Sequence, residues 1–85
     1  MKPIYTIYES KLNDENIWED GKAIGVTLFS SKTKARKAMR ARYETMEKRG
    51  ADASFYEKSG LQEPYYEFDR NGNRFMHYIV QCILV

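Results

Sequence analysis

The segment from Ser30 to Gly50 constrains the fold most, because it carries the start signal, the apolar periodicity and the end signal of one long helix. Ser30 is a natural N-cap, with Ser31 as the competing choice, since a serine hydroxyl accepts from the free N–H groups of the first turn. Glycine at position 50 is typical of the residue that follows a helix. The stripe that packs on a sheet is predicted to be Ala35, Ala38, Met39, Tyr43 and Met46.

The charge of this predicted helix opposes its own stability. Stability alone favours acidic residues in the first turn, where the helix dipole is positive. Residues 32–49 instead contain eight Lys or Arg and two Glu, a net charge of +6 in a chain of net charge +2, so the other residues sum to −4. An anionic partner is one explanation. The basic residues that precede the first acid, Glu44, are Lys32, Lys34, Arg36, Lys37, Arg40 and Arg42.

A second explanation is that an acidic segment of the same chain lies beside the helix and balances its charge. Residues 9–20 form such a segment, because they contain one basic residue, Lys11, and five acidic ones. The acidic residues are Glu9, Asp14, Glu15, Glu19 and Asp20. Internal balance and a basic patch that faces a partner therefore remain equal alternatives.

Arg42 is an anomaly, since it falls inside the apolar stripe on a helical wheel. We favour the interpretation that its side chain snorkels to solvent or pairs with a sheet carboxylate such as Glu67. A recessed contact with an anion is the alternative.

A hairpin is predicted near the end of the chain. Tyr65–Asp69 and Phe75–Val85 flank Asn71-Gly72, a dipeptide suited to the positive φ angles of a type I′ turn. The last segment is apolar on both of its alternating faces. It is therefore a central strand, or its second face meets another chain.

Two further strands are predicted before the helix, at Ile4–Glu9 and Ala23–Phe29. In residues 51–63, Phe55-Tyr56 either opens a short strand or pins a loop onto the core. The predicted fold is α+β, a three- to four-stranded antiparallel sheet with one long helix on one face, in β-β-α-β-β order.

The size of the chain predicts one domain, spanning all 85 residues. A domain of this size buries about 60% of the surface that its unfolded chain exposes, so self-association is a direct way to gain stability. A single helix covers one face of the sheet. Because the other face of the sheet is left uncovered, we expect it to be buried in a homodimer or against a target.

No set of residues in the sequence predicts catalysis. His77 has no acidic neighbour along its strand, and Cys82 lies on the opposite, apolar face, so we expect both to be structural. Gly21 and Gly25 lack the spacing of a phosphate-binding loop. We therefore expect no enzyme activity and no cofactor, and one cysteine with one histidine argues against a structural zinc site.

The first residues of the chain contain no long apolar run of the kind that forms a signal peptide or membrane span. A single cysteine, which cannot form an internal disulfide, fits a reducing compartment. We expect a cytoplasmic protein without membrane contact.

Two binding functions fit the basic helix. The first is a protein-binding module that meets an acidic surface with its helix and uses aromatic anchors on its sheet. The alternative is a nucleic-acid-binding protein that contacts phosphates through the same helix. The candidate partner-binding residues are Lys32, Lys34, Arg36, Lys37, Arg40, Tyr65 and Tyr66.

The junction from Gly25 to Ala35, GVTLFSSKTKA, places a strand ending in Phe-Ser before a Lys-rich first turn and a packed alanine. This junction resembles small phage and mobile-element proteins, including anti-CRISPR and other anti-defence proteins of similar size and layout. The resemblance implies an inhibitor that acts by occlusion on a host defence complex, for which a nucleic-acid-binding complex is one candidate. No functional residue is carried over from these proteins, and Thr33 stands where they often have glutamate.

Overall fold

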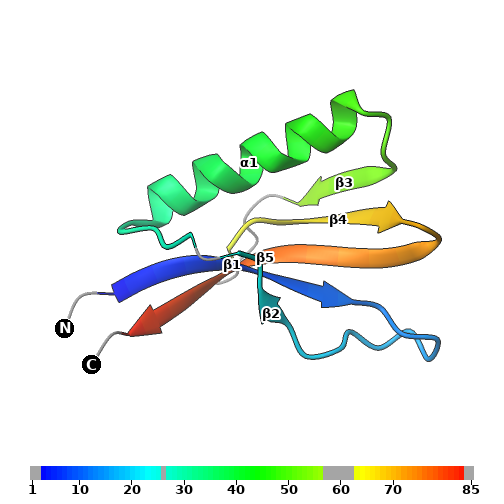
Figure 1. Cartoon of the computed structure of the whole chain (residues 1–85), viewed down its shortest axis with the longest axis horizontal. Helices are drawn as coiled ribbons and strands as arrows, with labels where there is room; N and C mark the ends of the chain where they lie inside the picture. Colours follow the sequence, from blue (N-terminus) through cyan, green and yellow to red (C-terminus); the bar gives the residue numbers. More distant parts are fainter. Residues whose placement is uncertain (1–2, 26, 57–62, 84–85) are drawn as a thin grey trace.

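The computed structural model describes residues 3–25, 27–56 and 63–83. These residues form a five-stranded antiparallel sheet in the order β2-β1-β5-β4-β3, with helix α1 across one face (Figure 1). The α+β class is therefore confirmed, but the sheet has more strands than the three to four that we predicted. The elements are β1 (Pro3–Lys11), β2 (Lys22–Ala23), α1 (Lys32–Lys48), β3 (Ala53–Tyr56), β4 (Tyr65–Arg70) and β5 (Asn73–Ile83).

Helix α1 begins one residue later than a cap at Ser30 would place it. The Oγ of Ser31 accepts from the backbone N–H of Lys34 at 3.2 Å, so Ser31 is the N-cap and the choice of Ser30 is wrong. Gly50 follows the helix with φ of 82°, as the glycine at this position of the sequence predicted. The predicted stripe is confirmed, because Ala35, Met39 and Tyr43 are buried and Ala38 and Met46 are half-buried.

The predicted hairpin is confirmed as β4 and β5, joined at Asn71 and Gly72, which have φ of 52° and 82°. Strand β5 lies between β1 and β4, so the prediction of a central strand is confirmed. Leu84 and Val85, at the end of the predicted strand, lie outside the described residues.

The predicted strand at Ala23–Phe29 is wrong over most of its length. Ladder pairing with β1 is limited to Lys22 and Ala23, because Gly25 adopts φ of +68° and turns the chain out of extended geometry. The chain returns to β1 at Phe29, which exchanges backbone hydrogen bonds of 2.8 and 2.9 Å with Tyr5. Val26 lies outside the described residues.

The open question at residues 51–63 resolves in favour of a strand. Phe55 and Tyr56 belong to β3, which pairs with β4 at the edge of the sheet. Residues 57–62 of this segment lie outside the described part of the chain.

The core lies between α1 and the sheet face beneath it. Its buried members are Ile7 of β1, Met39 and Tyr43 of α1, and Tyr66 and Phe68 of β4. Burial of these side chains is what holds the helix on the sheet. Within the described ranges, α1 is the sole helix, and it is not long and apolar enough to cross a membrane.

Candidate functional site

Three of the predicted partner-binding residues line one hollow of about 280 Å³ where α1 meets β3 and the start of β4. Arg36, Lys37 and Arg40 supply its cationic groups, because positions three and four apart lie on the same side of a helix. Phe55 of β3 and Pro64, just before β4, supply its apolar surface. We call this hollow the helix groove.

A carboxylate of the chain itself lies beside the helix groove. Both oxygens of Glu63 accept from Nη2 of Arg36 at 2.7 Å, and Nζ of Lys32 lies 3.5 Å from Glu63 Oε1. The hydrogen bond from Arg36, with the charges of Arg36 and Lys32, lowers the pKa of the Glu63 carboxyl below its usual value, despite some desolvation. This end of the helix therefore already binds one carboxylate.

Arg40 is positioned by aromatic rings. Its guanidinium carbon lies 4.5 Å from the centre of the Phe55 ring and 5.5 Å from that of Tyr43. Its Nε also lies 3.4 Å from an oxygen of Glu44, one turn along α1. These contacts hold the cationic group at the groove, so the Arg40 side chain loses less conformational entropy when a partner binds.

Several basic residues of the helix have no acidic partner among residues 3–25, 27–56 and 63–83. Lys37, Arg42, Lys48 and Arg49 are exposed and form no ion pair with a described residue. Lys34 is also exposed, and its Nζ donates to the hydroxyl of Ser30 at 3.2 Å.

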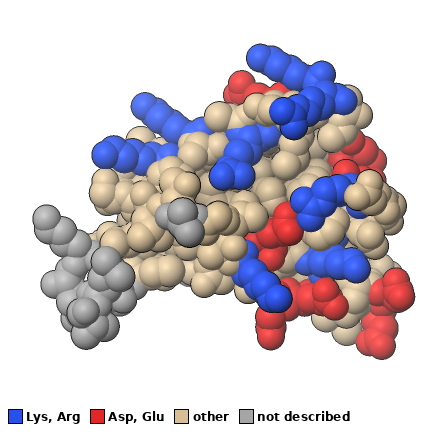
Figure 2. All heavy atoms as spheres, in the orientation of Figure 1, with Lys and Arg blue, Asp and Glu red and all other residues tan. Residues whose placement is uncertain are grey.

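The acidic N-terminal segment does not balance the helix. Figure 2 shows Lys and Arg side chains over α1, whereas many Asp and Glu side chains gather at the lower right, where the β1–β2 connection lies. Among the described residues, no ion pair joins α1 to residues 14–20. Internal compensation comes instead from Glu63 and Glu44.

The two tyrosines predicted to join the helix in partner binding lie elsewhere. Tyr66 has no exposed surface and packs in the core under α1, so its assignment as a surface contact is wrong. Tyr65 lies on the opposite face of the sheet, because neighbouring residues of a strand point to opposite faces. Of the two interpretations favoured for Arg42, its exposure agrees with a side chain that reaches solvent, and pairing with Glu67 is wrong, since Glu67 bonds to Arg74.

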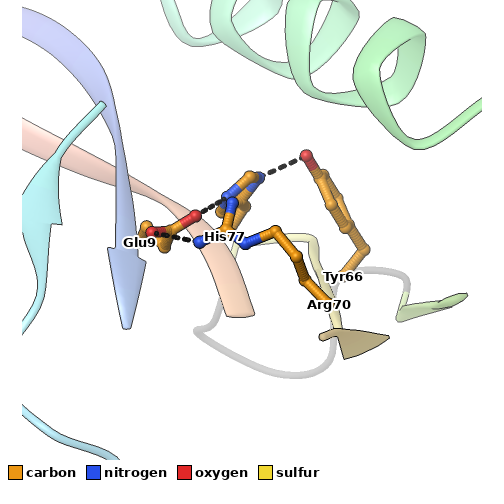
Figure 3. A network of polar contacts seen from close by, with 4 residues as sticks. All are labelled: Glu9, Tyr66, Arg70 and His77. Atoms are coloured by element: carbon orange, nitrogen blue, oxygen red, sulfur yellow. Dashed lines mark hydrogen bonds and ion pairs between the residues drawn. The ribbon is translucent and has the colours of Figure 1, made fainter. Parts of the chain in front are cut away.

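Tyr66 belongs instead to a network of polar side chains inside the sheet (Figure 3). Its hydroxyl contacts Nδ1 of His77 at 2.5 Å, and Nε2 of His77 contacts Oε1 of Glu9 at 2.9 Å. Nη2 of Arg70 donates to the other oxygen of Glu9 at 3.2 Å. The residues come from β1, β4 and β5, and their side chains point toward one another.

The network is satisfied when His77 is neutral with its proton on Nε2, which donates to Glu9 while Nδ1 accepts the Tyr66 proton. Burial lowers the pKa of His77, an effect that Glu9 partly offsets, so this neutral form is favoured. Burial also raises the pKa of Tyr66. Both imidazole nitrogens are engaged and His77 is only 3% exposed, so the network has no nitrogen to offer a substrate.

Sequence reasoning missed Glu9 and Glu63 as partners of His77 and Arg36. Glu9 and His77 are 68 positions apart, and no local pattern indicates that β1 pairs with β5. The contact of Tyr66 with His77 did have a signal, since the Asn71-Gly72 turn sets the register that places them opposite each other. Within the described residues, no group of His, Cys, Asp and Glu is arranged to hold a metal ion.

Comparison with known proteins finds no matching family model, no matching curated protein and no matching solved structure.

Proposed function

We propose that the chain is a non-enzymatic protein-binding module that presents the outer side of α1 to an acidic protein surface. The observation that carries the proposal is the helix groove, where Arg36, Lys37 and Arg40 surround an apolar base formed by Phe55 and Pro64. Cationic groups beside aromatic and apolar surface are typical of interface hot spots, in which arginine is enriched.

The position of Glu63 supports a carboxylate-bearing partner. Arg36 and Lys32 bind the Glu63 carboxylate, so their charge and geometry suit a carboxylate group. Lys37 and, further along α1, Lys48 are exposed and add positive charge to the helix, which steers an acidic partner toward the groove.

The proposal has a narrower form, which rests on the resemblance of the Gly25–Ala35 junction to phage anti-defence proteins. In that form the partner is a component of a host defence complex. The chain inhibits it by covering an acidic or nucleic-acid-facing surface, which requires no catalytic group.

Nucleic-acid binding through the same helix is the alternative, and the Phe55 ring beside basic residues is the observation that favours it. The Arg40 guanidinium lies over that ring, however, and the Glu63 carboxylate lies beside the cations that would bind phosphate. The position of Arg40 leaves less room for a stacked base, whereas the charge of Glu63 acts against a phosphate and a protein carboxylate alike.

The test uses charge reversal on two faces of the molecule. The double variant Lys37→Glu with Arg40→Glu alters the helix groove, and Lys22→Glu in β2 is the matched control, because Lys22 is exposed and remote from α1. Proteins captured by the wild-type chain are purified, and their affinity for each variant is measured at about 50 mM and about 200 mM salt.

We expect the affinity of the groove variant for a captured acidic protein to be at least about tenfold lower than that of the wild type, and the affinity of Lys22→Glu to be unchanged. Equal loss in both variants, or none in either, would contradict the proposal. Labelled single- and double-stranded oligonucleotides form a second arm. Binding to them that falls steeply with salt and is abolished by the groove variant would favour the nucleic-acid alternative.

A further inference from the structure

Four tyrosines form a row across the sheet face opposite α1. Tyr8 of β1 pairs directly with Tyr78 of β5, Tyr78 pairs with Tyr65 of β4, and Tyr65 pairs with Tyr56 of β3. Directly paired residues of adjacent strands share a face, so the row crosses four strands. The ring centroids of Tyr8 and Tyr78 are 6.0 Å apart, and those of Tyr56 and Tyr65 are 4.9 Å apart. We call these residues the tyrosine row.

The sheet face on one side of the row, toward the chain termini, carries no charged side chain among the described strand residues. Strand alternation places Ile4, Thr6, Val80 and Cys82 there.

The charged residues of this face lie on the other side of the row, toward the β4–β5 turn, and they bond to one another. Arg74 lies 3.2 Å from Glu67 and 3.0 Å from Asp69. Both carboxylates therefore share one guanidinium, and the face as a whole presents little uncompensated charge.

A hollow of about 390 Å³ opens beside the tyrosine row. Trp18 reaches it from the β1–β2 connection, where Leu12 and Trp18 form a β-bridge. Aromatic residues and methionine are enriched in the buried cores of protein interfaces. The residues that line the hollow are Trp18, Glu63, Tyr65, Met76, Tyr78 and Ile79.

We propose that this face binds a second copy of the chain, so that two tyrosine rows meet in a twofold-symmetric dimer. A twofold interface brings one patch against its own copy, and a patch of strong net charge therefore repels itself. The outer side of α1 is such a patch, because Lys37 is exposed there and forms no ion pair with a described residue. The tyrosine face has its charges paired internally and meets its copy without that repulsion.

Single-stranded nucleic acid is the other occupant to consider for a row of rings, but it needs cations beside the rings. Arg74 is the sole cation of the described strands on this face, and two carboxylates engage it. The charge of the face therefore favours a second copy. In this dimer both α1 helices remain on the outside, so the inference does not depend on the function proposed for the helix.

The test is the mass of the full chain in solution, measured by sedimentation equilibrium from about 1 μM to about 500 μM. We expect the mass to rise with concentration toward twice the 10.0 kDa of the chain. Trp18 is the only tryptophan, so its emission should shift to longer wavelength as dilution exposes the hollow. A constant mass of 10.0 kDa over the whole range would overturn the proposal.

Two variants place the interface. Tyr56→Arg alters the exposed end of the row, where folding is least at risk, and Val80→Arg adds charge to the uncharged part of the face. Each should raise the dimer dissociation constant by at least about tenfold, with an unchanged circular dichroism spectrum. Lys37→Glu, on α1, should leave it unchanged.

A dimer that survives Tyr56→Arg but dissociates in Lys37→Glu would place the interface on the helix and overturn the proposal. A monomer whose Trp18 emission responds to a single-stranded oligonucleotide would assign the face to nucleic acid and would also overturn it.

Discussion

His77 Nε2 lies 2.9 Å from Glu9 Oε1, at directly paired positions of β5 and β1. The two residues are 68 positions apart, so this hydrogen bond forms only when the long-range pairing of the sheet is in place. Tyr66 engages the second imidazole nitrogen from β4. The network thus connects three adjacent strands of the sheet through side chains, and its first consequences concern stability.

Stability should decrease as the pH falls below about 6.5. Burial lowers the pKa of His77 from its usual value of 6.5, with partial compensation by Glu9, so the unfolded chain takes up a proton that the folded chain does not. The free energy of unfolding should fall by up to about 1.4 kcal/mol per pH unit in this window. Urea denaturation at a series of pH values measures it.

His77→Gln provides the control, since it removes the titrating group. Its unfolding free energy should depend less on pH between about pH 6.5 and pH 5. Burial raises the pKa of Glu9, but hydrogen bonds from His77 and Arg70 outweigh this effect and the net pKa is lowered from 4.5. The Glu9 contribution is therefore present above about pH 4.5 and is lost at lower pH. The same slope in wild type and variant would contradict the role of His77.

Tyr66→Phe should destabilise the fold by about 1–3 kcal/mol, because it leaves the buried Nδ1 of His77 without a donor. Tyr65→Phe is a matched control at the adjacent position, where the ring lies on the other face of the sheet. It should change stability by less than about 0.5 kcal/mol. Urea denaturation compares the two, and equal effects would show that the Tyr66 hydroxyl does not support His77.

Ser31→Ala should cost about 0.5–2 kcal/mol, because it removes the acceptor of the Lys34 N–H at the start of α1. Ser30→Ala should cost less, since the Ser30 hydroxyl accepts from the exposed side chain of Lys34 and not from a backbone N–H of the first helical turn. Thermal or urea denaturation measures both. A larger cost at Ser30 would move the cap by one residue and contradict the observed start of the helix.

Gly21→Ala should destabilise the β1–β2 connection. A Cβ at this position would lie 1.9 Å from the Tyr78 hydroxyl and 2.9 Å from Ser10 Oγ, which bond to each other at 3.1 Å. Relief of this overlap displaces the Tyr78 ring, and we expect a cost of about 1–3 kcal/mol. In a Tyr78→Phe background the cost should be smaller, because the nearest atom is gone; an undiminished cost would contradict this explanation.

The elements that follow from local pattern were predictable from the sequence. The helix at Lys32–Lys48 has its cap, stripe and terminal glycine in one segment, and the Asn71-Gly72 turn determines the β4–β5 register. The prediction of a strand at Ala23–Phe29 was wrong because the alternation of apolar residues gives no information on the backbone of Gly25. Its φ of +68° ends the ladder.

The candidate site was predictable only in part. The spacing of Arg36, Lys37 and Arg40 indicates one side of a helix, but Phe55 and Pro64 join them through tertiary packing. Tyr65 and Tyr66 were assigned together as adjacent aromatic residues, although neighbouring residues of a strand point to opposite faces. Which face α1 covers depends on sheet order, and the sequence does not encode that order in any local pattern.

Site-specific photo-crosslinking tests the central claim, that the outer side of α1 contacts a protein, most directly. A photoreactive amino acid replaces Ala41, which is exposed on α1, or the matched Ala23, which is exposed in β2. We predict a protein adduct at position 41 that weakens with salt, and none at position 23. A nucleic-acid adduct at position 41, or the same adducts at both positions, would contradict the account.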